Sequence, residues 1–157
     1  MFFECIDTIY LFIVFLNLGF LIVLSWEDFK SKEISKNLTF LCLFLLLSFH
    51  IFSLFFYEYE ISYQALLACL ILGAPFLLCV LLTKEKALGM GDVYIFMIMG
   101  LLVGVQYLFF SLSLVVFSAL AYSFFKYKKI GLKQKIPLVP FITFAIMVTT
   151  ILRFFLL

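Results

Sequence analysis

Long apolar runs, separated by short polar stretches, make up most of this chain. The runs are Ile9 to Ser25, Leu38 to Tyr57, Ile61 to Leu82, Val93 to Phe125 and Leu138 to Leu152. A helix that crosses a hydrocarbon core about 30 Å thick needs roughly 20 residues, so runs of this length are typical of transmembrane helices. The runs do not alternate apolar and polar positions as the strands of a membrane barrel do. The pattern therefore predicts an all-α, polytopic membrane protein.

The fourth run has an unusual length. Its 33 residues exceed what one span needs but fall short of two full spans with a turn. Gly100, Gly104 and Gln106 interrupt its middle, which favours a break there. With two spans in this region, the fourth helix begins near Ala87. We therefore expect six transmembrane helices with the N and C termini outside, forming a single transmembrane domain over residues 1–157.

Composition supports a membrane location. The sequence is 67% hydrophobic and 13% charged, with a mean hydropathy of +1.28, which lies well outside the usual range of soluble domains. Such a chain needs lipid as its solvent, so membrane lipid is an expected partner. The net charge of +2 gives no reason to expect a nucleic-acid partner.

The basic residues orient the chain in the membrane. With six spans, the segments Trp26 to Asn37, Thr83 to Asp92 and Lys126 to Lys135 share one side, and they hold ten of the eleven basic residues. The opposite side holds Glu4, Asp7, Glu58 and Glu60. Since basic loops stay in the cytoplasm, the lysine-rich side faces inward. Five spans would place a five-lysine loop outside, so the charges favour six.

The cysteines and the histidine predict no metal site and no cofactor. The four cysteines are scattered and form no Cys-x-x-Cys pair. We interpret them as small buried hydrophobic residues; they are Cys5, Cys42, Cys69 and Cys79. His50 lies near the outer end of the second run, and we interpret it as a packing or interfacial residue.

Two aspartates stand at the rims of predicted spans. Asp28 follows the first run, and Asp92 lies at the start of the fourth helix, so both face the cytoplasm in the six-span arrangement. An ionisable group costs about 2.5 to 3.5 kcal/mol at the centre of a membrane helix, and such residues therefore invite a functional explanation. Two neighbouring carboxyl groups share one proton. In an aspartic protease the ionised member activates water, while the protonated member polarises the scissile carbonyl.

Each aspartate also has a structural interpretation. Asp92 suits the N-cap or first turn of a helix, where a negative charge is favourable. Asp28 suits an interfacial acid beside Trp26 and Lys30. Two other functional classes also fit membrane carboxylates: a small membrane transporter that binds a proton or cation, and a non-catalytic membrane assembly factor.

Three ordered motifs make the sequence resemble the type IV prepilin peptidases, which are intramembrane aspartic peptidases of the Gly-x-Gly-Asp (GxGD) class. Gly89-Met-Gly-Asp92, followed by Gly100 and Gly104, is similar to the family's Gly-x-Gly-Asp-x7-Gly-x3-Gly run. The family's first aspartate, followed by an Ile-Pro-x-Asn/Asp element, resembles Asp28, Ile34 and Asn37. The family's Ile-Pro-x-x-Pro-Phe element resembles Ile136-Pro137-Leu-Val-Pro140-Phe141.

The resemblance implies a peptidase of the bacterial inner membrane with catalytic Asp28 and Asp92 at the cytoplasmic face. The implied substrate is a prepilin or pseudopilin, whose short basic leader is cut before a hydrophobic helix. Glycines before Asp92 permit close approach of a substrate strand. The candidate substrate contacts are Gly89, Gly91, Glu27, Pro137 and Pro140. Glu27, together with Glu33 and Glu85, is suited to attract a basic leader, or alternatively to pair with neighbouring lysines.

The sequence departs from the family pattern in three places. Ser35 stands where the family usually has Pro, and Tyr94 stands where Lys commonly follows the second aspartate, so the expected substrate contacts differ there. Longer members carry an N-terminal region with two Cys-x-x-Cys pairs and also methylate the new N-terminus of the product. Because this sequence has no such pairs, we expect a short, peptidase-only member without methyltransferase activity.

Overall fold

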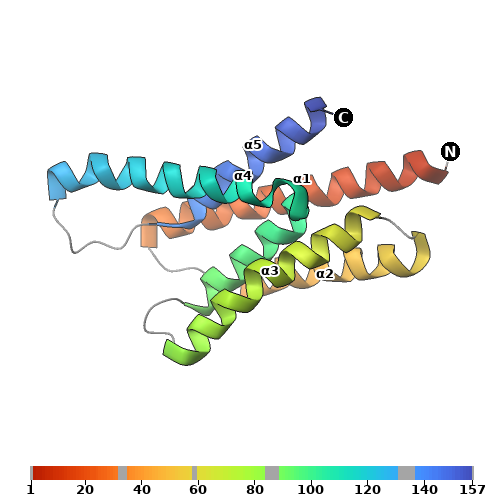
Figure 1. Cartoon of the computed structure of the whole chain (residues 1–157), viewed down its shortest axis with the longest axis horizontal. Coiled ribbons are helices and arrows are strands. Elements are labelled where there is room, and N and C mark those ends of the chain that lie inside the picture. Colours follow the sequence, from red (N-terminus) through yellow and green to blue (C-terminus); the bar gives the residue numbers. More distant parts are fainter. Residues whose placement is uncertain (1, 32–34, 58–59, 84–88, 131–136, 157) are drawn as a thin grey trace.

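The computed structural model describes residues 2–31, 35–57, 60–83, 89–130 and 137–156. Five helices and no strand occupy these ranges (Figure 1). In chain order they are α1 (Phe2–Ser31), α2 (Lys36–Tyr57), α3 (Glu60–Thr83), α4 (Met90–Ile130) and α5 (Val139–Leu156). The prediction of an all-α fold is therefore confirmed.

The outer surface of the helices is apolar. Within the described residues, three segments are long and apolar enough to cross a membrane, and a shorter apolar helix joins them: Lys36–Phe55, Ser62–Thr83, Met90–Phe125 and Val139–Arg153. Large apolar side chains point outward along these helices, and Phe109 is 83% exposed. A water-soluble monomer rarely exposes apolar surface on this scale. The chain is a multi-pass membrane protein.

Helix α4 is interrupted at one residue. Gly104 has φ 73° and ψ 171°, a backbone conformation that is almost confined to glycine. Figure 1 shows that α4 turns back at its middle, so that its second part runs toward the end of the molecule where α4 began. The break expected within residues 93–125 therefore occurs at Gly104. Gly100 and Gln106 have helical backbone angles.

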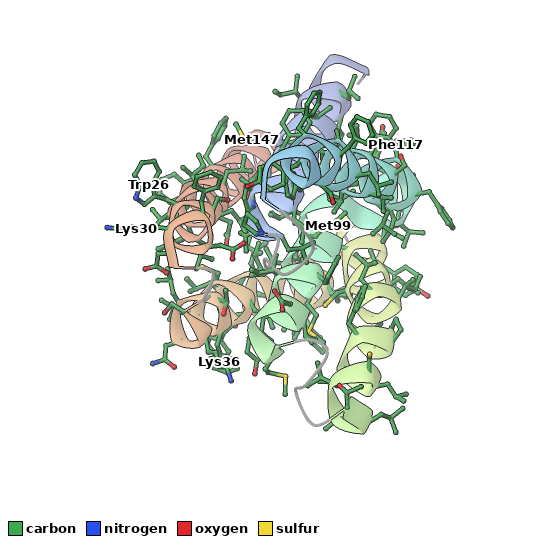
Figure 2. All side chains as sticks on the ribbon, turned by 90° about the vertical axis from the view of Figure 1, so that its left-hand side faces the viewer. Trp26, Lys30, Lys36, Met99, Phe117 and Met147 are labelled. Atoms are coloured by element: carbon green, nitrogen blue, oxygen red, sulfur yellow. The ribbon has the colours of Figure 1, made fainter. Side chains whose placement is uncertain are left out.

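Gly100 serves a different purpose, because it lets α4 approach α3 closely. A Cβ atom built at Gly100 would lie 2.7 Å from the backbone nitrogen of Cys69 and 2.8 Å from the backbone oxygen of Ala68. Stacked rings of Phe76 and Phe96, with centroids 4.0 Å apart, join the same two helices. The first part of α4 is therefore the centre of the fold, and Figure 2 shows its Met99 inside the bundle.

The structure also tests the burial predicted for the cysteines and the packing role predicted for His50. Cys42 and Cys69 are buried, as expected, but Cys79 is exposed on α3. The burial prediction is wrong there because Cys79 faces away from the neighbouring helices; the side chain of Cys5 lies outside the described residues. His50 is fully buried and hydrogen-bonded to Ser62, with 3.4 Å between Nδ1 and Oγ. Its predicted packing role is confirmed.

Candidate active site

The two aspartates lie at the same end of the bundle. Asp28 is in the last turn of α1, and Asp92 is in the first turn of α4. Figure 1 shows that α1 ends and that α4 and α5 begin at this end. Figure 2 looks onto it, and Trp26, Lys30 and Lys36 point away from the helices. Helix α5 packs against both α1 and α4, so it connects the two elements that carry the aspartates.

Asp28 is buried against the start of α5. Its side chain is 5% exposed, and its Oδ2 accepts a hydrogen bond of 2.9 Å from the backbone N–H of Val139. The residue lies beyond the apolar run that ends at Ser25. Burial raises the pKa of Asp28, while backbone hydrogen bonds from Val139 and Leu138 lower it in part. The neutral carboxyl group is favoured because few water molecules can solvate its charge.

The first turn of α5 explains why Asp28 is needed there. The carbonyl of Leu138 accepts hydrogen bonds of 3.2 Å from the N–H groups of Phe141 and Ile142, so Leu138 is the N-cap and Val139 is the first helical residue. A leucine side chain cannot accept a hydrogen bond, and Pro140 has no N–H to be satisfied. Asp28 therefore caps α5 from another helix by accepting the free N–H of Val139.

Asp92 is held by the start of its own helix. Its Oδ2 accepts a hydrogen bond of 3.2 Å from the N–H of Gly89, and its own N–H donates to the carbonyl of Gly89 at 3.1 Å. The bond from the Gly89 N–H to the Asp92 side chain is one half of a capping box; the other half is replaced by the Gly89 carbonyl, since glycine has no side chain to accept the Asp92 N–H. A helix N-terminus favours a negative charge at this position. The prediction of a first-turn acid is thus confirmed, and Asp92 is half-buried, in contrast to Asp28.

Two hydroxyl groups join α1 and α5 one turn away from Asp28. Ser25 Oγ and Thr143 Oγ1 are hydrogen-bonded at 2.7 Å, and Thr143 Oγ1 also donates to the carbonyl of Val139 at 2.9 Å. Neither residue was predicted from the sequence to belong to the site. A spacing signal was present, because Ser25 lies three residues before Asp28 and Thr143 four residues after Val139, which places each on the same helix face as its neighbour.

The remaining candidate site residues lie at the same end. Pro137 is buried and Pro140 is half-buried at the start of α5, next to the Val139 N–H that binds Asp28. Gly89 and Gly91 flank the start of α4. Glu27 is half-buried beside Asp28 in the sequence. Four other residues of the motifs and acidic set lie outside the described residues: Glu33, Ile34, Glu85 and Ile136.

Both residues that depart from the family pattern have structural contacts. The carbonyl of Ser35 accepts hydrogen bonds from the backbone N–H and the hydroxyl of Thr39, at 3.1 and 3.0 Å, so Ser35 is the N-cap of α2. The ring of Tyr94 lies 5.9 Å from that of Phe40, measured between centroids. Tyr94 therefore joins α4 to α2.

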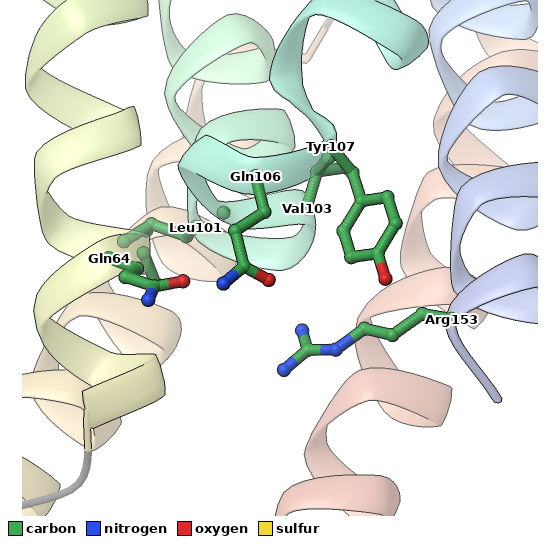
Figure 3. Close-up of a pocket in the computed structure, with 8 residues that line it drawn as sticks. Gln64, Leu101, Val103, Gln106, Tyr107 and Arg153 are labelled. Atoms are coloured by element: carbon green, nitrogen blue, oxygen red, sulfur yellow. The ribbon is translucent and has the colours of Figure 1, made fainter. Parts of the chain in front are cut away.

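A small polar cavity lies at the bend of α4, away from the aspartates. It measures about 10 Å³, which is room for about one water molecule. Figure 3 shows Gln64, Gln106, Tyr107 and Arg153 around it. Gly104, which also lines it, is twelve residues after Asp92, or about 18 Å along a helix. A helix break in an apolar medium exposes backbone groups that need polar partners, so we assign this cavity to the bend.

The fold and the site together define a multi-pass, all-helical membrane protein with one carboxyl group at the end of α1 and another at the start of α4. The type IV leader peptidase family matches residues 15–124, a stretch that includes both aspartates, Gly100 and Gly104. The chain belongs to this family of peptidases. No curated protein and no solved structure matches the chain.

Proposed function

We propose that this protein is an intramembrane aspartic endopeptidase that removes the basic leader from prepilin-like proteins. Asp28 and Asp92 are its catalytic pair, and water is the nucleophile. Membership of the type IV leader peptidase family supports peptidase activity in general. The observation that carries the assignment to these residues is their common position: each carboxyl group accepts a backbone N–H at a helix start, and both helix starts lie at one end of the bundle (Figure 1).

We propose a six-span arrangement with both termini outside. The two parts of α4 on either side of Gly104 would each cross the membrane, because the chain turns back at that residue (Figure 1). Helices α1 and α5 would be the first and last spans, and α2 and α3 the second and third. The ends that carry Asp28 and Asp92 would then face the cytoplasm of a bacterial cell, together with Lys30 and Lys36, in agreement with the preference of basic residues for that side.

The two carboxyl groups differ in their surroundings, and this difference suggests their resting roles. Asp28 is buried, and burial raises its pKa, so Asp28 would hold the shared proton. Asp92 is half-buried at a helix N-terminus, where a negative charge is favoured. Asp92 would therefore take a proton from water, while protonated Asp28 polarises the scissile carbonyl. The roles can exchange as the tetrahedral intermediate collapses.

The substrate class follows from the position of the pair. A site at the rim of the bilayer offers water, while the apolar helices beside it suit the hydrophobic helix of a prepilin or pseudopilin. Gly89 and Gly91 would let a substrate strand pass close to Asp92, with Pro137 and Pro140 on the α5 side. Glu27 would attract the basic leader. We propose proteolysis as the activity of this pair, and the proposed reaction uses neither a cofactor nor methyl transfer.

The test is to co-express a tagged prepilin-like substrate and to follow the loss of its leader. Asp28→Asn and Asp92→Asn should each abolish cleavage. Asp7→Asn is a matched control, because Asp7 lies 21 residues before Asp28 in the same helix, or about 30 Å away along it. Asn at position 28 can still accept the Val139 N–H, so the substitution keeps the cap of α5 and removes only the acid.

This design separates catalysis from helix capping. If Asp28 only caps α5, Asp28→Asn should cleave as well as the parent, and that result would contradict the proposed mechanism. A parent chain that leaves the substrate uncut would favour a membrane transporter or a non-catalytic assembly factor. Mass spectrometry of the product N-terminus would show whether it carries a methyl group, which the proposal does not expect.

A further inference from the structure

We propose that Ser25 and Thr143 are positioning residues for Asp28: their hydrogen bond sets the register of α5 against α1, so that the N–H of Val139 orients the Asp28 carboxyl group. This inference rests on the proposed function, in which Asp28 is catalytic. It concerns the orientation of the Asp28 carboxyl group, about which the sequence motifs and the family match give no information.

The geometry forms a closed chain of contacts between the two helices. Thr143 Oγ1 donates its proton to the carbonyl of Val139 at 2.9 Å, so in the contact of 2.7 Å between the two hydroxyl groups Ser25 is the donor. The carbonyl of Leu21, also 2.7 Å from Ser25 Oγ, is the alternative acceptor for the Ser25 proton. The N–H of the same Val139 donates to Asp28 Oδ2 at 2.9 Å. Thr143 therefore contacts Ser25 on α1 and Val139 on α5. Val139 in turn binds Asp28, which lies on α1 one turn from Ser25.

This connection is specific to one oxygen of the carboxyl group. A neutral carboxyl group has one carbonyl oxygen and one hydroxyl oxygen. The carbonyl oxygen is the better hydrogen-bond acceptor, so in neutral Asp28 it is the oxygen that accepts the Val139 N–H. Val139 binds Oδ2, so the proton resides on Oδ1. The register of α5 thereby decides which oxygen presents the proton to the scissile carbonyl.

A comparison within α5 shows what is special about Thr143. Thr149 is also a buried threonine on α5, and its hydroxyl donates to the carbonyls of Ala145 and Ile146, at 2.8 and 3.0 Å, in its own helix. Thr143 makes the same kind of bond within α5, and in addition it reaches Ser25 on α1. Thr149 is therefore the natural control for the loss of a buried hydroxyl group.

The first pair of variants tests the hydroxyl contact. Thr143→Val removes the bond to Ser25 and keeps the size of the side chain, and Thr149→Val makes the same change away from the site. We expect Thr143→Val to lower kcat for leader cleavage by about 3- to 20-fold, which is the range that loss of one hydrogen bond between membrane helices gives. KM should stay near the parental value, and Thr149→Val should match the parent in both constants.

The second pair tests the backbone donor. Val139→Pro removes the N–H together with the buried valine side chain, at a first helical position where proline is tolerated. Val139→Ala is the control, because it also removes side-chain packing but keeps the N–H. The Val139 N–H favours the ionised form of Asp28, so its loss makes that carboxyl group harder to ionise. The alkaline limb of the kcat–pH profile should move to higher pH in Val139→Pro and stay in place in Val139→Ala. Thr143→Val should shift it in the same direction by less.

The outcomes are distinguishable from failure of the proposed function. If the parent cleaves and Asp28→Asn does not, but Thr143→Val and Val139→Pro keep the parental kcat and pH profile, the positioning role is wrong while the catalytic pair stands. Equal losses in Thr143→Val and Thr149→Val, without a shift of the alkaline limb, also overturn it, since a merely structural hydroxyl would behave in that way. A parent that does not cleave overturns both proposals. If Val139→Pro does not accumulate in the membrane, Thr143→Val and Ser25→Ala decide the question.

Discussion

Gly100→Ala tests the close approach of α3 and α4, the helix whose first turn carries Asp92. The added Cβ atom would lie 2.7 Å from the nitrogen of Cys69 and 2.8 Å from the carbonyl carbon and oxygen of Ala68. These separations are about 0.6 Å short of ordinary van der Waals contact. All three atoms belong to the backbone of α3, so no side-chain rotation can relieve the clash, and the two helices must move apart.

The expected cost is about 1 to 3 kcal/mol, the usual range when extra atoms are forced into a packed interface. Gly73→Ala is the matched control, because Gly73 lies in the same α3–α4 interface but faces only side-chain atoms of Met97, with Cε at 2.5 Å and Cγ at 2.6 Å. An unbranched methionine can change rotamer, so Gly73→Ala should cost less than half as much. The assay is equilibrium or thermal unfolding of the purified protein in detergent, followed by circular dichroism.

Equal stabilities of Gly100→Ala and Gly73→Ala would contradict this reasoning, since they would mean that backbone contact is not limiting. The separation of the helices should also displace the start of α4, so Gly100→Ala should reduce leader cleavage more than its loss of folded protein explains. Cleavage per folded molecule therefore provides a second measurement in the same experiment.

Three further predictions concern other parts of the molecule. Gly104→Ala should destabilise the fold by about 1 to 3 kcal/mol in the same unfolding assay, because its positive φ alone causes strain: no atom lies within 4 Å of the added Cβ. Burial raises the pKa of Asp28 in the folded state, so the stability that neutral Asp28 contributes should be full below its unfolded pKa of about 3.9 and be lost as pH rises through its folded pKa. Thermal midpoints measured against pH should lose this dependence in Asp28→Asn. N-ethylmaleimide in detergent should label Cys79 before Cys42 or Cys69, since only Cys79 of these three is exposed, and peptide mass mapping would reveal the reverse order.

Hydropathy predicted the described helices well where the apolar run and the helix coincide. The second run, Leu38 to Tyr57, corresponds to α2, and the third, Ile61 to Leu82, corresponds to α3. Helix α1 extends beyond its run to Ser31, because hydropathy reports transfer into lipid while helix formation continues through polar residues. Asp28 lies in this polar extension, which is why a membrane helix can carry it.

The glycine motif and a helix break within it were predicted from the sequence, but the separate roles of its two glycines were not. Gly100 and Gly104 belong to one spacing pattern, yet one permits backbone contact with α3 and the other adopts a positive φ. A sequence pattern cannot distinguish these requirements, since glycine satisfies both.

The partner of Asp28 was also hidden from the sequence. The donor is a backbone N–H of Val139, and the sequence does not distinguish one backbone amide from another. The sequence offered one clue: the residues that open the last helix, Pro137 to Phe141, include no polar side chain to act as an N-cap. It indicates a free donor that another part of the chain must satisfy.

The central claim is that Asp28 and Asp92 act as one catalytic unit. The most direct measurement compares leader cleavage by purified parent, Asp28→Asn, Asp92→Asn, the double variant and Asp7→Asn in lipid vesicles with one prepilin-like substrate. We predict that each single Asn variant at positions 28 and 92 loses as much activity as the double variant, as residues of one catalytic unit do, while Asp7→Asn cleaves like the parent. Partial activity in either single variant, with a further multiplied loss in the double variant, would contradict a shared-proton pair.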